Sequence, residues 1–143
     1  MNREILFRGK CFGNWRYGSY VHFDKKPTHN CYNCNYKDFI VTNEEDGEHY
    51  YPITDLSSIG QYTGLKDKNG KQIFEGDILE YIGKRKDNMN KVYRRKIVFH
   101  EGMFALLSKE LQAYSALKHH CMEDGRSAWR VIGNIHDNPE IIE

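Results

Sequence analysis

The stretch IGQYTGLKDKNGKQIFEGDILEYI, from Ile59 to Ile82, carries the most regular turn chemistry in this chain of 143 residues. Asn69-Gly70 lies between two β-rich runs, and both residues tolerate the positive φ angles of a tight reversal. Gly76-Asp77 predicts a second turn, and the segment that follows, 78–82, has apolar side chains on both faces. The stretch therefore predicts strands joined by tight turns, with the last strand in the interior of a sheet.

The start of the same stretch contains two more glycines. Gly60 and Gly64 enclose Gln61, Tyr62 and Thr63. An extended segment closed by such permissive residues bends sharply, as strands do at the corner of a small barrel. Packing and barrel closure explain an aromatic ring beside two glycines as well as a binding pocket does. We therefore assign these three polar and aromatic residues to the architecture of the protein.

Two hairpins are predicted before this stretch. The run REILFRGKCFGNWRYGSYVHF (3–23) has aromatic and β-branched residues on both sides of Gly13-Asn14, as a hairpin requires. DFIVT (38–42) and HYYPIT (49–54) flank an acidic turn, and Pro52 favours a strand at the sheet edge. Residues between the two hairpins are polar and aperiodic, which predicts a loop.

A third hairpin is predicted after the central stretch. KVYRRKIVFHEGMFALL (91–107) offers two strands around a turn at Glu101-Gly102. Alternation of apolar and polar residues along these strands indicates which side chains point inward. They are Ile97, Phe99, Phe104 and Leu106.

One helix is predicted in the C-terminal half. In SKELQAYSALKHH (108–120) and the leucine before it, apolar residues recur at helical spacing, and Ser108 is suited to cap the start. AWRVIGNI (128–135) then predicts a last strand, and Asn138-Pro139, which resembles a cap followed by a first helical position, predicts a short terminal turn. The chain as a whole is therefore expected to be mainly β, with one short helix.

Composition sets the class of protein. Length fits one domain with a single apolar core, 39% of the residues are hydrophobic, and Lys+Arg 21 balance Asp+Glu 20. No run reaches the roughly 20 apolar residues of a membrane span, and the start MNREILFRGK does not have the apolar core of a signal peptide. We therefore expect a soluble, cytoplasmic protein without a membrane partner.

Several segments together resemble one family. ILFRGK (5–10) followed by WRYGSYV (15–21), the central run 59–79, and VIGNIHDNPEII (131–142) are similar in order and spacing to the YopX protein family of phage and prophage genomes. The resemblance implies a mostly β protein with a small SH3-like barrel core, in one domain over 1–143. It implies no activity, catalytic residue or substrate. The signature positions, to which we assign structural roles, are Gln61, Tyr62, Thr63, Gly64, Gly70, Gly76, Asp77, Gly133 and Asn134.

The loop over residues 24–35 departs from the family pattern through two cysteines. Cys31 and Cys34 have the C-x2-C spacing with which two thiolates share one zinc ion, and His29 is close by. A structural zinc site needs four ligands, and the other half would have to come from KHHCMEDG (118–125). The alternative is that the two cysteines are incidental. We expect no cofactor, with zinc at Cys31 and Cys34 as the alternative.

A second candidate site is electrostatic. The segment GKRKDNMNKVYRRK (83–96) concentrates positive charge in a nearly neutral chain, with Tyr93 among its cations and Tyr81 just before them. Cations beside an aromatic ring can bind phosphates and stack a single-stranded base. Charged loops and edge strands that discourage sheet pairing explain the same pattern. The residues concerned are Lys84, Arg85, Lys86, Lys91, Arg94, Arg95 and Lys96.

Motifs of catalysis are not found in the sequence. It has no G-x-S-x-G elbow, no H-E-x-x-H and no G-K-[ST] phosphate loop. Asp77 in its turn is suited to bind its own backbone. We therefore expect a non-catalytic interaction or accessory protein that binds a phage or host protein and forms homo-oligomers. A nucleic-acid-binding module using 84–96 is the alternative, and an enzyme is a distant third.

Overall fold

The structure is a computed structural model, and it describes residues 4–26 and 35–142. The chain divides into two compact units, Met1–Tyr62 and Thr63–Glu143. The single domain expected over 1–143 stays a prediction. None of the helical turns in the described ranges has the length and apolar character needed to span a bilayer.

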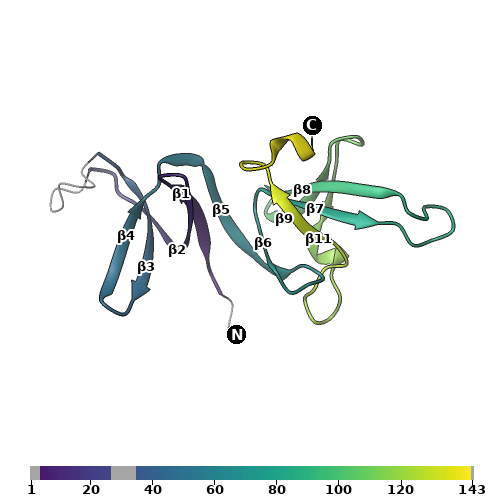
Figure 1. Cartoon of the computed structure of the whole chain (residues 1–143), viewed down its shortest axis with the longest axis horizontal. Helices are drawn as coiled ribbons and strands as arrows, with labels where there is room; N and C mark the ends of the chain where they lie inside the picture. Colours follow the sequence, from purple (N-terminus) through teal and green to yellow (C-terminus); the bar gives the residue numbers. More distant parts are fainter. Residues whose placement is uncertain (1–3, 27–34, 143) are drawn as a thin grey trace. The chain divides into compact units, whose positions relative to one another are not determined.

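The first unit is an antiparallel sheet (Figure 1). Its strands, in the order β4-β3-β2-β1-β5, are β1 (Phe7–Cys11), β2 (Asn14–His22), β3 (Asp38–Glu44), β4 (Gly47–Pro52) and the first part of β5 (Asp55–Lys66). Both predicted hairpins are confirmed, and Pro52 ends a strand at the sheet edge as expected. Its core consists of Cys11, Ile40 and Ile53, with half-buried aromatic rings around them.

The turn of the first hairpin lies one residue earlier than predicted. Cys11 pairs with Asn14, so the two-residue turn is Phe12-Gly13 rather than Gly13-Asn14. Both turn residues have positive φ angles, 51° and 81°, which is the geometry of a type I′ turn. Phenylalanine adopts this region at a steric cost, which is why residue preferences alone place the turn at the asparagine.

The second unit contains a five-stranded antiparallel sheet in the order β10-β9-β8-β7-β11 (Figure 1). Its strands are β7 (Asp77–Ile82), β8 (Val92–His100), β9 (Met103–Ser108), β10 (Ala113–Ala116) and β11 (Arg130–Asn134). The end of β5 also lies in this unit, where β6 (Gln72–Phe74) pairs with it. The interior position predicted for β7 and the hairpin at Glu101-Gly102 are both confirmed.

The predicted helix over 108–120 is wrong. Its first part is a turn followed by β10, and only the 3-10 turn η1 (Leu117–His120) is helical. Leu111, counted as part of an apolar stripe, is 71% exposed, and Gln112 has a φ of 49°, outside the helical region. The helical spacing of apolar residues is therefore incidental, because Tyr114 instead faces Leu107 across the β9–β10 ladder. A second 3-10 turn, η2 (Pro139–Ile141), confirms the predicted terminal turn.

The main hydrophobic cluster of the second unit lies on the face of its sheet opposite to Ile78, which is also buried. Its buried members are Ile73, Leu79, Ile97, Leu106, Leu117 and Trp129. Ile97 and Leu106 were predicted to point inward and do so, but Phe99 is 57% exposed. Phe99 stacks edge-on against Phe104, one pair from the turn, with ring centroids 5.3 Å apart. Alternation thus indicated the face of the strand, but not how far along it the core extends.

The mainly β fold is confirmed, and the barrel is not. Within residues 4–26 and 35–142 the strands form open sheets, and no closed barrel occurs. Gly64 does have a positive φ of 83°, yet β5 continues through it to Lys66 instead of turning a barrel corner. The likeness to an SH3 domain stays a prediction.

Candidate functional site

The strand β8 divides the predicted basic segment between two faces of the second sheet. In the β7–β8 ladder, Glu80 lies opposite Arg94, and the next residue along β7, Tyr81, lies opposite Tyr93. Successive side chains of a strand point to opposite faces. Arg94 therefore shares a face with Glu80, while Arg95 shares the other face with the two tyrosines. The basic segment is not one continuous patch.

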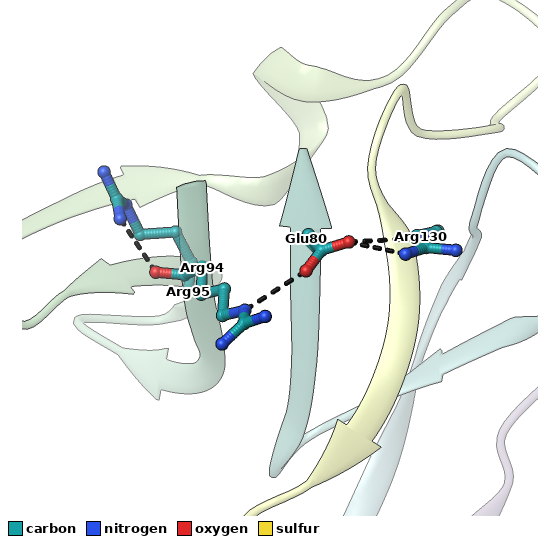
Figure 2. Close-up of polar contacts among 4 residues, drawn as sticks. All are labelled: Glu80, Arg94, Arg95 and Arg130. Atoms are coloured by element: carbon teal, nitrogen blue, oxygen red, sulfur yellow. Dashed lines mark hydrogen bonds and ion pairs between the residues drawn. The ribbon is translucent and has the colours of Figure 1, made fainter. Parts of the chain in front are cut away.

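On the first of these faces, Glu80 holds two arginines (Figure 2). Its Oε2 accepts a hydrogen bond from Arg94 Nε at 3.1 Å, and its Oε1 accepts from Arg130 Nη2 at 2.6 Å and Nε at 3.2 Å. The Glu80 side chain is 8% exposed, whereas those of Arg94 and Arg130 are 47% and 46% exposed. The hydrogen bonds from Arg130, together with the one from Arg94, hold the pKa of the Glu80 carboxyl below its ordinary value. The carboxylate thus fixes both guanidinium groups at the surface.

Arg95 takes a different direction from Arg94. Its Nη1 donates to the backbone carbonyl oxygen of Arg94 at 2.7 Å, and its guanidinium points away from Glu80 (Figure 2). Arg95 Cζ lies 5.7 Å from the centroid of the Tyr93 ring, and Lys91 Nζ lies 5.0 Å from the same centroid. Two cations therefore surround one tyrosine, at distances typical of cation–π contacts.

Tyr93 begins a row of three aromatic rings on this face. Its centroid lies 6.2 Å from that of Tyr81, and the Tyr81 centroid lies 5.6 Å from that of Trp129, with interplanar angles of 36° and 35°. Trp129 is buried and also belongs to the core, while the two tyrosines are half-buried. The core thus holds the rings in place and leaves parts of the tyrosines accessible.

These rings line a hollow of about 550 Å³, which we call the aromatic groove. Its walls include Tyr81, Tyr93, Trp129, Arg95, Tyr114 and His120. The strands β7, β8 and β10 and the turn η1 supply most of these side chains. Since four tyrosine and tryptophan rings and the cation of Arg95 line the groove, it suits a planar ligand that carries negative charge.

A hydrogen-bonded pair adds polarity to the groove. The Oγ of Ser115 lies 2.7 Å from the Nε2 of His120, and both residues line the groove. Burial lowers the pKa of the His120 imidazole. The ring packs edge-on against Trp129, with centroids 5.9 Å apart. The pair therefore offers hydrogen-bonding atoms beside the aromatic surface.

Of the remaining cations of the basic segment, Lys96 lies in β8 on the face of Arg94, and the others lie in the loop between β7 and β8. Backbone hydrogen bonds close this loop, from Gly83 N–H to the carbonyl oxygen of Lys91 at 2.8 Å and from Asn90 N–H to that of Gly83 at 2.9 Å. The side chain of Asn88 accepts from the Arg85 N–H at 2.9 Å. Lys84, Arg85 and Lys86 are thus exposed on an internally bonded loop.

Comparison with known proteins identifies the family. The model of the YopX protein family matches residues 7–143. The chain belongs to the YopX protein family. Among solved structures it is similar to the crystal structure of protein EF1440 from Enterococcus faecalis, with 26% identity, a TM-score of 0.53, and coverage of 99% of this chain and 100% of that one. No curated protein matches it.

Several residues of the predicted signature in the centre of the chain make local hydrogen bonds. Asp77 Oδ2 accepts from the Phe74 N–H at 2.8 Å across the β6–β7 turn, and Thr63 Oγ1 donates to the carbonyl oxygen of Ile73 at 2.8 Å. Tyr62 is buried, and its N–H donates to the carbonyl oxygen of Leu6 at 2.8 Å. Two of the glycines in the signature, Gly70 and Gly76, have φ angles of 84° and 86°. These turns require glycine because other residues rarely adopt that region.

The C-terminal part of the signature closes a tight turn. A Cβ added at Gly133 would lie 2.5 Å from Asn138 Oδ1, so the backbone needs glycine for this close approach. Asn134 Oδ1 accepts from the N–H groups of His136 and Asp137 at 3.0 and 2.9 Å. Asn138 was expected to cap η2, but its side chain instead accepts from the Asn134 N–H at 3.3 Å.

The zinc candidates Cys31 and Cys34, with His29, lie outside the described residues, so that hypothesis stays a prediction. Cys121, from the proposed second half of the site, is a free thiol whose Sγ donates to the carbonyl oxygen of Leu117 at 3.4 Å. Elsewhere in the described chain, ligand atoms of Glu44, Asp46 and His49 lie within 4.8 Å of one another. These three side chains lie near the surface and pair with each other. The structure supplies no further sign of a metal there.

Sequence reasoning found part of the aromatic groove and missed the rest. It singled out Tyr81 and Tyr93 beside the basic residues, but it treated Trp129 only as part of the last strand. It also placed Ser115 and His120 in a predicted helix, and a helix gives no reason to expect these two side chains beside the tyrosines. Tyr81 and Tyr93 lie on either side of the β7–β8 loop and pair directly across the ladder. A tyrosine on each side of a polar loop is therefore the sequence signal that pointed toward this surface.

Proposed function

We propose that this chain acts by binding rather than catalysis, and that the aromatic groove holds single-stranded nucleic acid. The row of three aromatic rings, Tyr93, Tyr81 and Trp129, with two cations beside the first ring, carries the proposal. Each base has a flat π-face that stacks on aromatic side chains, and each nucleotide brings a phosphate that attracts Lys or Arg. A single strand presents both groups at once.

The spacing of charge and rings supports a single strand over a duplex. In duplex nucleic acid the base faces are stacked on each other and only the edges are accessible. Tyr93 and Tyr81 line a concave surface rather than projecting from a helix or ribbon that could enter a groove of the duplex. The ligand class that uses stacking and phosphate contacts together is therefore the unpaired strand.

The sequence alone favoured a protein partner, with nucleic acid as the alternative. The geometry of the groove leads us to prefer nucleic acid. Arg94 is engaged by Glu80, so the seven predicted basic residues do not act as one patch. Lys91 and Arg95, beside Tyr93, are the members placed to contact a phosphate of a stacked nucleotide. A protein partner becomes the outcome to test if nucleic acid does not bind.

Fluorescence anisotropy with labelled oligonucleotides tests the proposal. We expect single-stranded DNA or RNA of about twelve nucleotides to bind at low salt, better than the matching duplex. Tyr93→Leu should weaken binding roughly tenfold, because stacking contributes about 1–3 kcal/mol per base. Tyr50→Leu, which removes an exposed tyrosine of the first unit, is the control and should leave affinity unchanged.

The salt dependence gives a second readout. Arg95→Gln should reduce the slope of log K against log salt by about 0.7, the value for one phosphate contact on a single strand. Lys96→Gln removes the same charge from the next residue, on the opposite face of β8, and should leave the slope unchanged. No binding of any single strand at low salt would overturn the proposal and leave a protein partner as the function to pursue.

A further inference from the structure

A second hollow, of about 460 Å³, adjoins the aromatic groove in the second unit. Tyr81, Met122 and Ala128 line both hollows, so the two hollows share part of their lining. The charged residues that line the second hollow are Lys68, Lys84, Arg130 and Glu80. We call it the cationic hollow.

The charges of the cationic hollow favour an anion. Lys68, Lys84 and Arg130 contribute three positive charges and Glu80 one negative charge, so 3 − 1 leaves a net charge of +2 among its lining residues. Both carboxylate oxygens of Glu80 already accept hydrogen bonds from arginines, one from Arg94 and the other from Arg130. The carboxylate therefore orients the guanidinium of Arg130 and is itself neutralised by it.

The backbone places the two lysines at this hollow. The N–H of Lys68 donates to the carbonyl oxygen of Trp129 at 3.0 Å, which holds the β5–β6 turn beside the residue that precedes β11. Asp67, buried in the same turn, accepts from the Val131 N–H at 3.0 Å. Lys84 follows Gly83, whose N–H closes the β7–β8 loop. The lysine backbones are thus fixed, and their side chains are exposed.

We propose that the cationic hollow is a phosphate subsite, which binds the phosphate adjoining the nucleotide whose base stacks in the aromatic groove. This inference rests on the proposed function and adds Lys68 and Arg130, both outside the predicted basic segment, to the binding surface. Tyr81 lines both hollows, so a strand with a base against its ring has its backbone beside Lys68 and Lys84. A fixed guanidinium with exposed N–H groups suits a phosphate oxygen.

A matched pair of double variants tests the subsite in the full chain. Lys68→Gln with Lys84→Gln removes two charges from the hollow, and Lys71→Gln with Lys86→Gln removes two from exposed sites of the same unit that do not line it. With labelled oligothymidine as the probe, the first pair should lower the salt slope by about 0.7, the value for the one phosphate that the subsite binds. The control pair should leave the slope unchanged. Arg130 is left intact because replacing it would also unpair Glu80.

The outcomes separate the two proposals. If oligothymidine binds, Tyr93→Leu weakens it and both double variants keep the wild-type slope, the phosphate subsite is overturned and the aromatic groove stands. If oligothymidine does not bind the wild type, NMR titration with pyrophosphate tests the hollow alone. Shifts of the Lys68, Lys84 and Arg130 amides that disappear in the first double variant then support an anion site. Absence of these shifts overturns it.

Discussion

Arg94 and Arg95 are consecutive residues of β8, but they lie on opposite faces of the β7–β8 ladder and make different contacts. On one face, Arg94 joins Arg130 in holding the buried carboxylate of Glu80. On the other, Arg95 lies beside Tyr93 at the rim of the aromatic groove. One arginine has its charge balanced by the protein, while the other lies where a ligand can contact it. Two consecutive residues of one basic run thus have separate roles, because a strand sends them to opposite faces.

The two faces also differ in what they contribute to stability. The groove face is continuous with the hydrophobic core, since Trp129 is both a core residue and a wall of the groove. Around Glu80, the opposite face instead has an ion-pair cluster whose two arginines are half-exposed. Losses on the groove face should therefore cost more free energy of unfolding than losses on the Glu80 face. Four predictions test this difference.

The largest effect is expected for Trp129→Ala. Removing a buried indole from the core should lower the free energy of unfolding by about 3–5 kcal/mol, from lost burial and the cavity left behind. Urea denaturation followed by circular dichroism measures it. Trp129→Phe, which keeps an aromatic ring, should recover a large part of the loss. A Trp129→Ala protein within about 1 kcal/mol of wild type would show that the groove face is not part of the core.

A smaller loss is expected for Glu80→Gln on the opposite face. The amide keeps the size of the side chain but leaves two guanidinium groups without their shared anion, which we expect to cost about 2 kcal/mol. The figure is below that of a fully buried pair because both arginines are partly hydrated. Glu110→Gln, at an exposed turn residue, is the control, and equal denaturation midpoints for the two variants would contradict the prediction.

The same cluster should make stability depend on pH. The Glu80 carboxyl has a lower pKa in the folded protein than in the unfolded chain, so the ionised form favours folding. Its contribution is complete above the unfolded pKa of about 4.3 and is lost as the pH falls through the folded pKa. The difference in unfolding free energy between wild type and Glu80→Gln should therefore be constant near neutral pH and shrink in acid. A difference that grows as the pH falls would contradict this prediction, because it would mean that the protonated form of Glu80 favours folding.

The smallest changes in stability are expected for substitutions of Arg94 and Arg95. Arg94→Gln should lower the free energy of unfolding by about 0.5–1 kcal/mol, because a half-exposed pair is screened by water and Glu80 keeps Arg130. Arg95→Gln should change stability by less than about 0.5 kcal/mol while affecting oligonucleotide binding. Thermal denaturation and anisotropy on the same preparations measure both. If Arg95→Gln lowered stability more than Arg94→Gln, or if only Arg94→Gln weakened oligonucleotide binding, the two faces would not differ as described.

Local patterns predicted the strands well where turn chemistry was strong. The hairpins around Glu101-Gly102 and over 38–54 were found because turn residues and alternating side chains are local properties. The region 108–120 failed because apolar residues at helical spacing also arise in a turn and a short edge strand. Propensity in that segment was overridden by pairing between β9 and β10, which involves residues that sequence spacing alone does not compare.

The candidate site was predicted only in pieces for the same reason. The basic run was visible, but its division into Arg94 with Glu80 and Arg95 with Tyr93 depends on the register of β7 against β8. Trp129 and Lys68 join the surface through contacts between segments about sixty residues apart, such as the hydrogen bond from the Lys68 N–H to the Trp129 carbonyl oxygen. Spacing along the chain contains no direct record of such contacts.

The amino-acid sequence by itself determined the mainly β class, the glycine-dependent turns and the membership of the YopX family. These depend on φ preferences, on side-chain alternation and on a pattern of residues along one chain. Only the tertiary structure decided that the sheets stay open, that Glu80 balances two arginines from neighbouring strands, and that three distant aromatic rings form one row. Strand order and register set those features, because they determine which side chains meet across a sheet.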